Sequence, residues 1–137
     1  MDILPKRLVG PKPSGGILTM TNVPTPELLL PLPPATLHIL LAVAETDRHG
    51  YAIMQDVEAR TDGELRLSAG TLYRAMARMV EQGLIVEVEK RRTRADDERR
   101  RYYRITSFGQ AVARAEMRRL LQLVRHAQAR GLTPRAI

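Results

Sequence analysis

One continuous stretch, from Arg66 to Thr106, constrains the fold more than any other part of the chain. It begins with a segment whose apolar residues recur every three to four positions, which is typical of an amphipathic helix. Two short runs rich in β-branched and aromatic residues follow, with an arginine-rich turn between them. A helix that offers arginines to the outside, followed by a hairpin with a cationic tip, is the layout of a winged helix-turn-helix.

The expected helix begins near Ser68, a residue type that often caps helix N-termini. Its apolar side is expected to hold Leu72, Met76, Met79, Val80 and Gly83, and its polar side Thr71, Arg74, Arg78, Glu81 and Gln82. The first strand, 84–90, is expected to point Val86 and Val88 inward. In the second strand, 100–105, Tyr102 and Tyr103 point to opposite faces, so one belongs in the core. The other is expected at the surface, where it could lie beside a helix that forms a dimer, beside DNA or beside a ligand.

The remaining elements follow from local signals. Residues 1–33 are rich in Pro and Gly and predict a mostly irregular arm, although Leu28 to Leu32 could pack against the body. Met20 is an alternative translational start. A first helix is expected over 35–46, with Leu37, Leu40, Leu41 and Ala44 on one face. A second is expected over 51–60, with Gly63 as a left-handed cap after it and Ile53, Val57 and Tyr51 as its candidates for burial.

The last helix is expected to start with Ser107 and Gln110 in capping-box spacing and to end near Gly131. The fold class is therefore mainly α with a small β-hairpin wing and a long C-terminal helix. The chain divides into an arm (1–33), a winged helix-turn-helix domain (34–106), a dimerisation helix (107–131) and a tail (132–137).

Charge is distributed unevenly. The chain has a formal net charge of +7 and a pI near 10.5, which favours a polyanionic partner. Residues 35–65 carry six acidic and two basic residues, whereas residues 66–104 carry eleven basic and six acidic ones. Cationic character is thus concentrated on the expected reading helix, the wing and the last helix. The chain has no cysteine and no long apolar run, which predicts a cytoplasmic protein without a membrane span.

Three phrases together resemble the PadR family of bacterial transcriptional regulators. They are HGYAIMQDVE from His49, SAGTLYRAMARMVEQGLI from Ser68, and RRRYYRITSFGQ from Arg99. Arg74 departs from the family, which often has proline after Leu-Tyr. The wing tip also departs, since it is often Gly/Pro-rich and here holds Ala95 to Glu98 between arginines. The resemblance implies a DNA-binding regulator, predicted to be a repressor that acts as a homodimer on a palindromic operator.

The candidate DNA-binding residues lie on the expected helix and wing. Arginine can bind guanine bidentately, and Ser and Thr can reach bases or phosphates. The set is Ser68, Thr71, Tyr73, Arg74, Arg78, Arg91, Arg92, Arg94, Arg99 and Arg100. The plainer interpretation is a solvated helix face, a core tyrosine, and wing arginines paired with Asp96, Asp97 and Glu98. The candidate dimerisation residues are Met117, Leu120, Leu121 and Val124, with packing on the first helix of the same chain as the alternative.

Other function classes find little support. The three histidines do not share a metal-ligand spacing, and no catalytic motif is present, so neither a metal, a cofactor nor an enzymatic activity is expected. Two alternatives stay open: a nucleic-acid binder, of DNA or RNA, without sequence preference, and a winged helix used for protein contacts. The expected partners are double-stranded DNA, a second copy of the chain and, as a hypothesis, an unidentified small-molecule effector.

Overall fold

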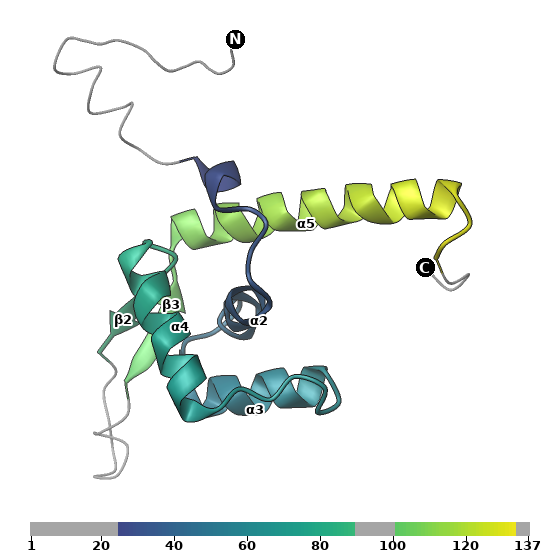
Figure 1. The fold of residues 1–137 in the computed structure, drawn as a ribbon. Helices are drawn as coiled ribbons and strands as arrows, with labels where there is room; N and C mark the ends of the chain where they lie inside the picture. The colour runs from purple at the N-terminus through teal and green to yellow at the C-terminus, as the bar shows by residue number, and fades with distance from the viewer. Residues whose placement is uncertain (1–24, 90–100, 134–137) are drawn as a thin grey trace, which may run out of the picture.

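The computed structural model describes residues 25–89 and 101–133 (Figure 1). Within these ranges the elements, in chain order, are η1 (Pro26–Leu29), α2 (Pro34–Ala42), β1 (Arg48–His49), α3 (Gly50–Arg60), α4 (Ala69–Glu81), β2 (Ile85–Val88), β3 (Tyr102–Ile105) and α5 (Ser107–Ala129). The expected fold class, mainly helical with a small hairpin and a long last helix, is confirmed.

Helix α2 begins at Pro34, where a missing N–H costs nothing, but its buried face is not the expected one. Ile39, Leu40 and Val43 are buried, whereas Leu41 is 41% exposed and Ala44 is exposed. The face that Leu37, Leu40, Leu41 and Ala44 were expected to share is therefore not the face that packs. The run from Leu37 to Ala44 is apolar on every side, so its sequence has no period that could identify the face that packs.

The connection from α3 to α4 sets the angle of the helix-turn-helix. Asp62 and Gly63 both adopt left-handed backbone conformations, with φ of 52° and 79°. The Gly63 amide donates to the Glu58 carbonyl (2.8 Å), which closes the C-terminus of α3 as expected for a glycine cap. The Thr61 hydroxyl accepts from the Leu65 amide (3.1 Å) and holds the following segment, from which α4 starts.

The sheet has three strands in the order β1-β3-β2. Strands β2 and β3 form the expected antiparallel hairpin, with Ile85 opposite Ile105. Strand β1 was not expected: Arg48 pairs with Tyr103 and His49 with Tyr102. The inward side of β2 also differs from the expectation, because Ile85 is buried and Val86 is 43% exposed.

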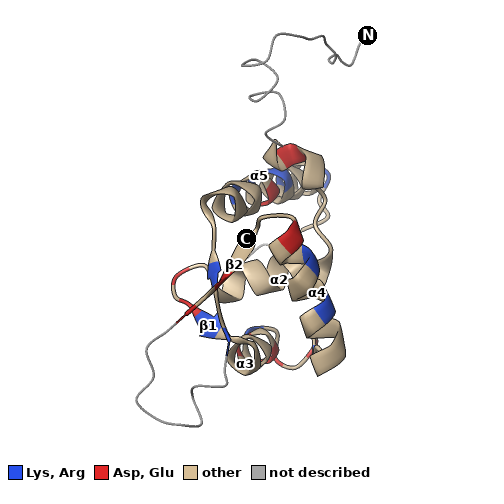
Figure 2. Ribbon diagram, turned by 90° about the vertical axis from the view of Figure 1, so that its left-hand side faces the viewer, with Lys and Arg blue, Asp and Glu red and all other residues tan. Residues whose placement is uncertain are grey.

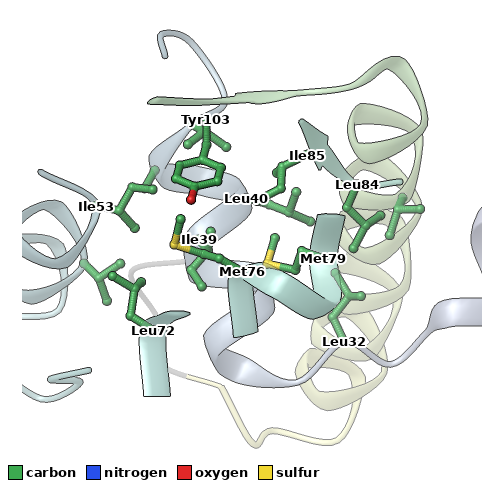
Figure 3. Packing of buried hydrophobic residues seen from close by; sticks show 14 residues of the cluster. Leu32, Ile39, Leu40, Ile53, Leu72, Met76, Met79, Leu84, Ile85 and Tyr103 are labelled. Atoms are coloured by element: carbon green, nitrogen blue, oxygen red, sulfur yellow. The ribbon is translucent and has the colours of Figure 1, made fainter. Parts of the chain in front are cut away.

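The core lies where the helices meet this sheet (Figure 3). It joins Ile39 and Leu40 of α2, Ile53 of α3, Met76 of α4 and Ile85 of β2. Other buried residues of the core are Val57, Leu72, Met79, Leu84, Tyr103 and Val112. Full burial of one such side chain stabilises the fold by about 1.5–3 kcal/mol. Because α4 supplies three of these residues, its polar side is held at a fixed orientation.

Helix α5 is capped by Thr106 rather than by Ser107. The Thr106 side chain accepts from the Gly109 amide (2.9 Å) and donates to the Gly83 carbonyl (2.5 Å), so the expected Ser107 cap was wrong. A Cβ on Gly109 would overlap the Leu84 carbonyl oxygen, so this glycine permits the close approach of α5 to the start of β2. Gly131, with φ of 74°, follows the C-terminus as expected.

The end of the arm packs on α5. Residues Pro26–Leu29 form a short 3-10 helix beside α5 (Figure 1). Leu32 is buried in the core (Figure 3). The option that Leu28 to Leu32 pack against the body therefore holds for Leu32 and, with partial burial, for Leu29 and Leu30, whereas Leu28 is 76% exposed. Beyond this contact, α5 extends away from the body. No helix in the described ranges is long and apolar enough to cross a membrane.

Candidate functional site

The N-terminal turn of α4 is closed by its own hydroxyl groups. The Ser68 Oγ accepts from the Thr71 amide (3.1 Å) and also lies 3.0 Å from the Thr71 Oγ1, to which it donates. Both residues are exposed. The expected role of Ser68 as an N-cap is confirmed, and the pair leaves other amides of the first turn available to an anion.

The outer side of α4 carries two exposed arginines. Arg74 and Arg78 are one helical turn apart and share a side with Thr71, whereas Leu72, Met76 and Met79 are buried opposite. Figure 2 shows the basic positions of α4 on the side turned away from α2. Within residues 25–89 and 101–133, neither guanidinium forms an ion pair. Their charge is therefore available to an external anion.

Arg74 lies close to the start of its helix. A Cβ built on Gly70 would be 3.2 Å from the Arg74 Nη1, so the guanidinium folds back over this glycine. Because Gly70 has no side chain, the Arg74 guanidinium can lie over the first turn of α4, close to the amides of that turn. Positive charge and helix N–H groups thus occupy the same end of α4.

Tyr73 connects α4 to the start of α3. It is 50% exposed, and a Cβ on Gly50 would overlap its hydroxyl group. Tyr73 is thus neither fully buried nor fully exposed, and its contact with a DNA phosphate stays a prediction. Tyr51, in the first turn of α3, is 57% exposed, although it was considered for burial. Sequence reasoning missed Tyr51 as a surface candidate, and the available signal was its position directly after Gly50 in the second-helix phrase.

All five wing candidates lie outside the described residues. Arg91, Arg92, Arg94, Arg99 and Arg100 all lie in the segment 90–100, which the structure does not describe. Arg101, directly before β3, is exposed and forms an ion pair with Glu87 of β2 (3.6 Å). The two strands that lead to the wing tip are nevertheless in place beside α4, since β2 follows α4 after a short turn at Gly83.

The arginines around β1 and β3 are internally paired. Arg104 of β3 forms two hydrogen bonds with Asp47 (3.0 and 2.9 Å), and these bonds raise the pKa of the guanidinium. Arg48 donates to the Ala42 carbonyl (2.6 Å) and lies 3.9 Å from Asp56. These pairs fasten the sheet to the helical body. Their charges are compensated, in contrast to those of Arg74 and Arg78.

The two wing tyrosines have different places. Tyr103 is the core residue: it is 7% exposed, and burial raises the pKa of its hydroxyl. Tyr102 is half-buried and packs edge-to-face with His49 at 5.3 Å. The His49 Nδ1 accepts from the Ala52 amide (3.2 Å) and caps α3. His49 therefore links β3 to the first helix of the helix-turn-helix.

The four candidate dimerisation residues lie on the part of α5 that leaves the body. Met117 is 40% and Leu121 49% exposed, while Leu120 and Val124 are half-buried. The earlier part of α5 packs on α2 and η1 and buries Val112 and Ala115. The helix thus has two uses: its first half packs within the chain, and its second half presents an apolar stripe that includes the exposed Leu123.

The histidines of α2 and α5 contact neighbouring side chains of the same chain. Among the residues that the structure describes, no three His, Asp or Glu side chains lie close enough to hold an ion. His38 contacts Arg60 (3.3 Å), and its pKa is lowered by burial and by that guanidinium. His126 contacts Gln122 (3.2 Å) on α5.

Comparison with known proteins gives the same overall picture. The model of the transcriptional regulator PadR-like family matches residues 39–115. Among curated proteins, an uncharacterised protein of Lysinibacillus sphaericus is 37% identical over 73 residues, which are 53% of this chain and 65% of that protein. The transcriptional regulator Rv3488 of Mycobacterium tuberculosis is 34% identical over 89 residues, which are 65% of this chain and 78% of the relative.

Solved structures agree in fold. A transcriptional regulator from Clostridium thermocellum is 27% identical, with a TM-score of 0.58, and the match covers 72% of this chain and 90% of the other. A PadR family transcription regulator from Clostridium difficile is 23% identical, with a TM-score of 0.61, and the match covers 71% and 97%. The second likeness concerns the fold alone.

Proposed function

The chain belongs to the PadR-like family of transcriptional regulators, and from this premise we propose that it binds DNA sequence-specifically and represses transcription as a homodimer on a palindromic operator. Helix α4 reads base edges in the major groove, and the wing contacts the adjacent backbone. The proposed DNA-contacting residues are those singled out from the sequence, with Tyr51 added.

One observation carries this proposal. Arg74 and Arg78 are exposed and have no ion-pair partner in the described part of the chain, on a helix whose opposite side is locked in the core. Base readout requires side chains that are both free and rigidly placed, because a bidentate arginine–guanine contact has strict geometry. The paired arginines near β1 cannot serve in the same way, since Asp47 already occupies the Arg104 guanidinium.

The dimer is proposed from the second half of α5. An isolated helix end with exposed Met117, Leu121 and Leu123 is stabilised when a second copy covers its apolar stripe. A two-fold dimer then presents two α4 helices to half-sites about one DNA turn apart. Occlusion of a promoter by such a dimer represses transcription. Release by a small-molecule effector is a hypothesis that belongs to the same proposal.

Selection of bound sequences from a random duplex pool tests the proposal. We expect enrichment of an inverted repeat that the purified protein prefers over random duplex by ~10³-fold or more. Equal affinity for every duplex or for RNA would instead favour a binder without sequence preference. No affinity for any duplex at low ionic strength would favour a winged helix for protein contacts.

A further inference from the structure

Glu116 is a carboxylate buried at the point where α5 leaves the body. Its residue is 1% exposed, yet it lies on a helix whose later residues are all exposed or half-buried. A buried carboxylate is unfavourable unless hydrogen bonds and charge compensate it. Because an uncompensated carboxylate would be unfavourable here, we look to the hydrogen bonds of Glu116 for the reason that it is buried.

Three donors satisfy the carboxylate. Arg119 donates from Nε to Oε1 (2.6 Å) and from Nη2 to Oε2 (3.1 Å), one turn further along α5. The third donor is the backbone amide of Leu32, 3.0 Å from Oε2 and 84 residues away in the sequence. The Arg119 contacts neutralise the charge within the helix, whereas the Leu32 contact joins α5 to a different segment.

That segment is firmly tied to the core. The Leu32 side chain is part of the hydrophobic core, and Pro33 and Pro34 lead directly from it into α2. Residues 26–29 lie beside α5 as η1 (Figure 1). The Glu116–Leu32 hydrogen bond therefore connects the last buried position of α5 to the centre of the DNA-binding domain. Residues 25–33 and Glu116 both lie outside the region that the family model matches, 39–115.

Glu116 is the last buried residue before the projecting part of α5, so a change of direction at this residue moves the whole of that part. From Glu116 to the end of α5 at Ala129, the helix extends about 20 Å at ~1.5 Å per residue. A tilt of roughly 10° at Glu116 would move that end by about 3.5 Å, which is close to the ~3.4 Å between successive nucleotides of a DNA strand. A small change in the direction of α5 at Glu116 thus changes the distance between the two DNA-binding units of a dimer by about one base pair.

We propose that Glu116 is a positioning residue that fixes the direction of α5 through the Leu32 amide and so sets the distance between the two DNA-binding units of the dimer. This inference rests on the proposed function. Glu116 itself does not contact DNA, and its effect is on how two half-sites are bound together.

The first test compares half-site spacing. The full chain and its Glu116→Ala variant are titrated with the selected operator, with a single half-site, and with operators that have one base pair more or less between half-sites. We expect the variant to keep its half-site affinity, to lose about 10-fold or more on the operator, and to discriminate less between spacings. An unchanged spacing preference, or an equal loss on the half-site, would overturn the proposal.

Two further variants provide the controls. Glu27→Ala removes an exposed carboxylate that also bridges η1 and α5, through Arg118 at 3.8 Å, and we expect it to behave like the parent. Glu116→Gln keeps an oxygen for the Leu32 amide, so it should retain the spacing preference; loss of that preference would contradict the proposal. If Glu116→Ala does not fold, Glu116→Leu fills the space without an acceptor and is expected to show the same loss.

A measurement without DNA separates this inference from the proposed function. The chain has no cysteine, so Gln55→Cys and Gln128→Cys place spin labels on exposed positions of α3 and α5 alone. In labelled chains diluted with unlabelled ones, we expect a narrow distance distribution in the parent and a broader one in the Glu116→Leu background. Failure of the parent to bind any duplex would contradict the proposed function. A distance distribution in the variant as narrow as that of the parent would contradict the positioning role of Glu116.

Discussion

At the scale of single residues, Arg74 and Arg78 combine exposure, the absence of an ion pair within the described part of the chain, and a place on the outer side of α4. Other arginines in the described part of the chain, such as Arg48, Arg60 and Arg104, are held by carboxylates. Substitution of Arg74 or Arg78 by alanine should reduce the preference for the operator by about 1–3 kcal/mol if the contact is bidentate to guanine. Fluorescence anisotropy with operator and random duplex measures this preference.

Arg114→Ala is the matched control, since Arg114 is an exposed arginine on α5, away from the α4 face. It should leave the preference unchanged. An equal loss of affinity on operator and random duplex would assign Arg74 or Arg78 to the phosphate backbone instead of the bases.

Glu116 also gives a prediction about pH. Its pKa is lowered chiefly by the Arg119 hydrogen bonds and further by the Leu32 amide, against the opposing effect of burial. A carboxylate with a lowered folded-state pKa stabilises the fold fully above its unfolded pKa of about 4.3, and this contribution is lost as the pH falls through the lower folded value. Urea unfolding should therefore show that the advantage of the parent over Glu116→Gln shrinks below about pH 4.3. An advantage that is constant from neutral to acid pH would contradict this.

At the scale of elements, the N-terminus of α5 offers a pair of neighbouring hydroxyl residues with different roles. Thr106 caps the helix and donates to the end of the α4–β2 turn, whereas Ser107 is exposed. Thr106→Ala should lower the free energy of unfolding by about 0.5–2 kcal/mol, and Ser107→Ala should have little effect. Chemical denaturation of the two variants measures the difference. A larger loss in Ser107→Ala would reverse the assignment of the cap.

The elements that the sequence predicted well are those with a strong local signal. Helix α4 alternates its polar and apolar sides with helical period, and the Ser68 cap and the hairpin have recognisable residue types. The buried face of α2 could not be predicted, because an unbroken apolar run gives no phase. Strand β1 is two residues long and exists only through pairing with β3, more than fifty residues later.

The same distinction applies to the candidate site. The exposure of Arg74 and Arg78 follows from the helical wheel, so it could be expected from sequence. The half-burial of Tyr73 depends on Gly50 of another helix, and the burial of Glu116 depends on the Leu32 amide. Contacts between distant segments carry no local pattern, so sequence reasoning did not identify them.

At the scale of the whole molecule, the division of α5 into a packed first half and a projecting second half provides the last prediction. Leu120→Asp combined with Leu121→Asp places two charges on the proposed dimer stripe, where burial of unpaired carboxylates is strongly unfavourable. Both positions lie beyond Glu116, in the half of α5 that projects from the body. The variant should therefore keep its fold and sediment as a monomer.

Leu41→Asp is the control for this change, because Leu41 is an exposed leucine (41%) on α2, outside the stripe. It should sediment like the parent. The monomeric variant should still bind a single half-site but lose the gain in affinity that two linked half-sites provide, about 10²-fold or more when the geometry fits. A double-aspartate variant that remains a dimer would instead place the dimer contact elsewhere on the molecule, and the proposed link between α5 and operator spacing would fail with it.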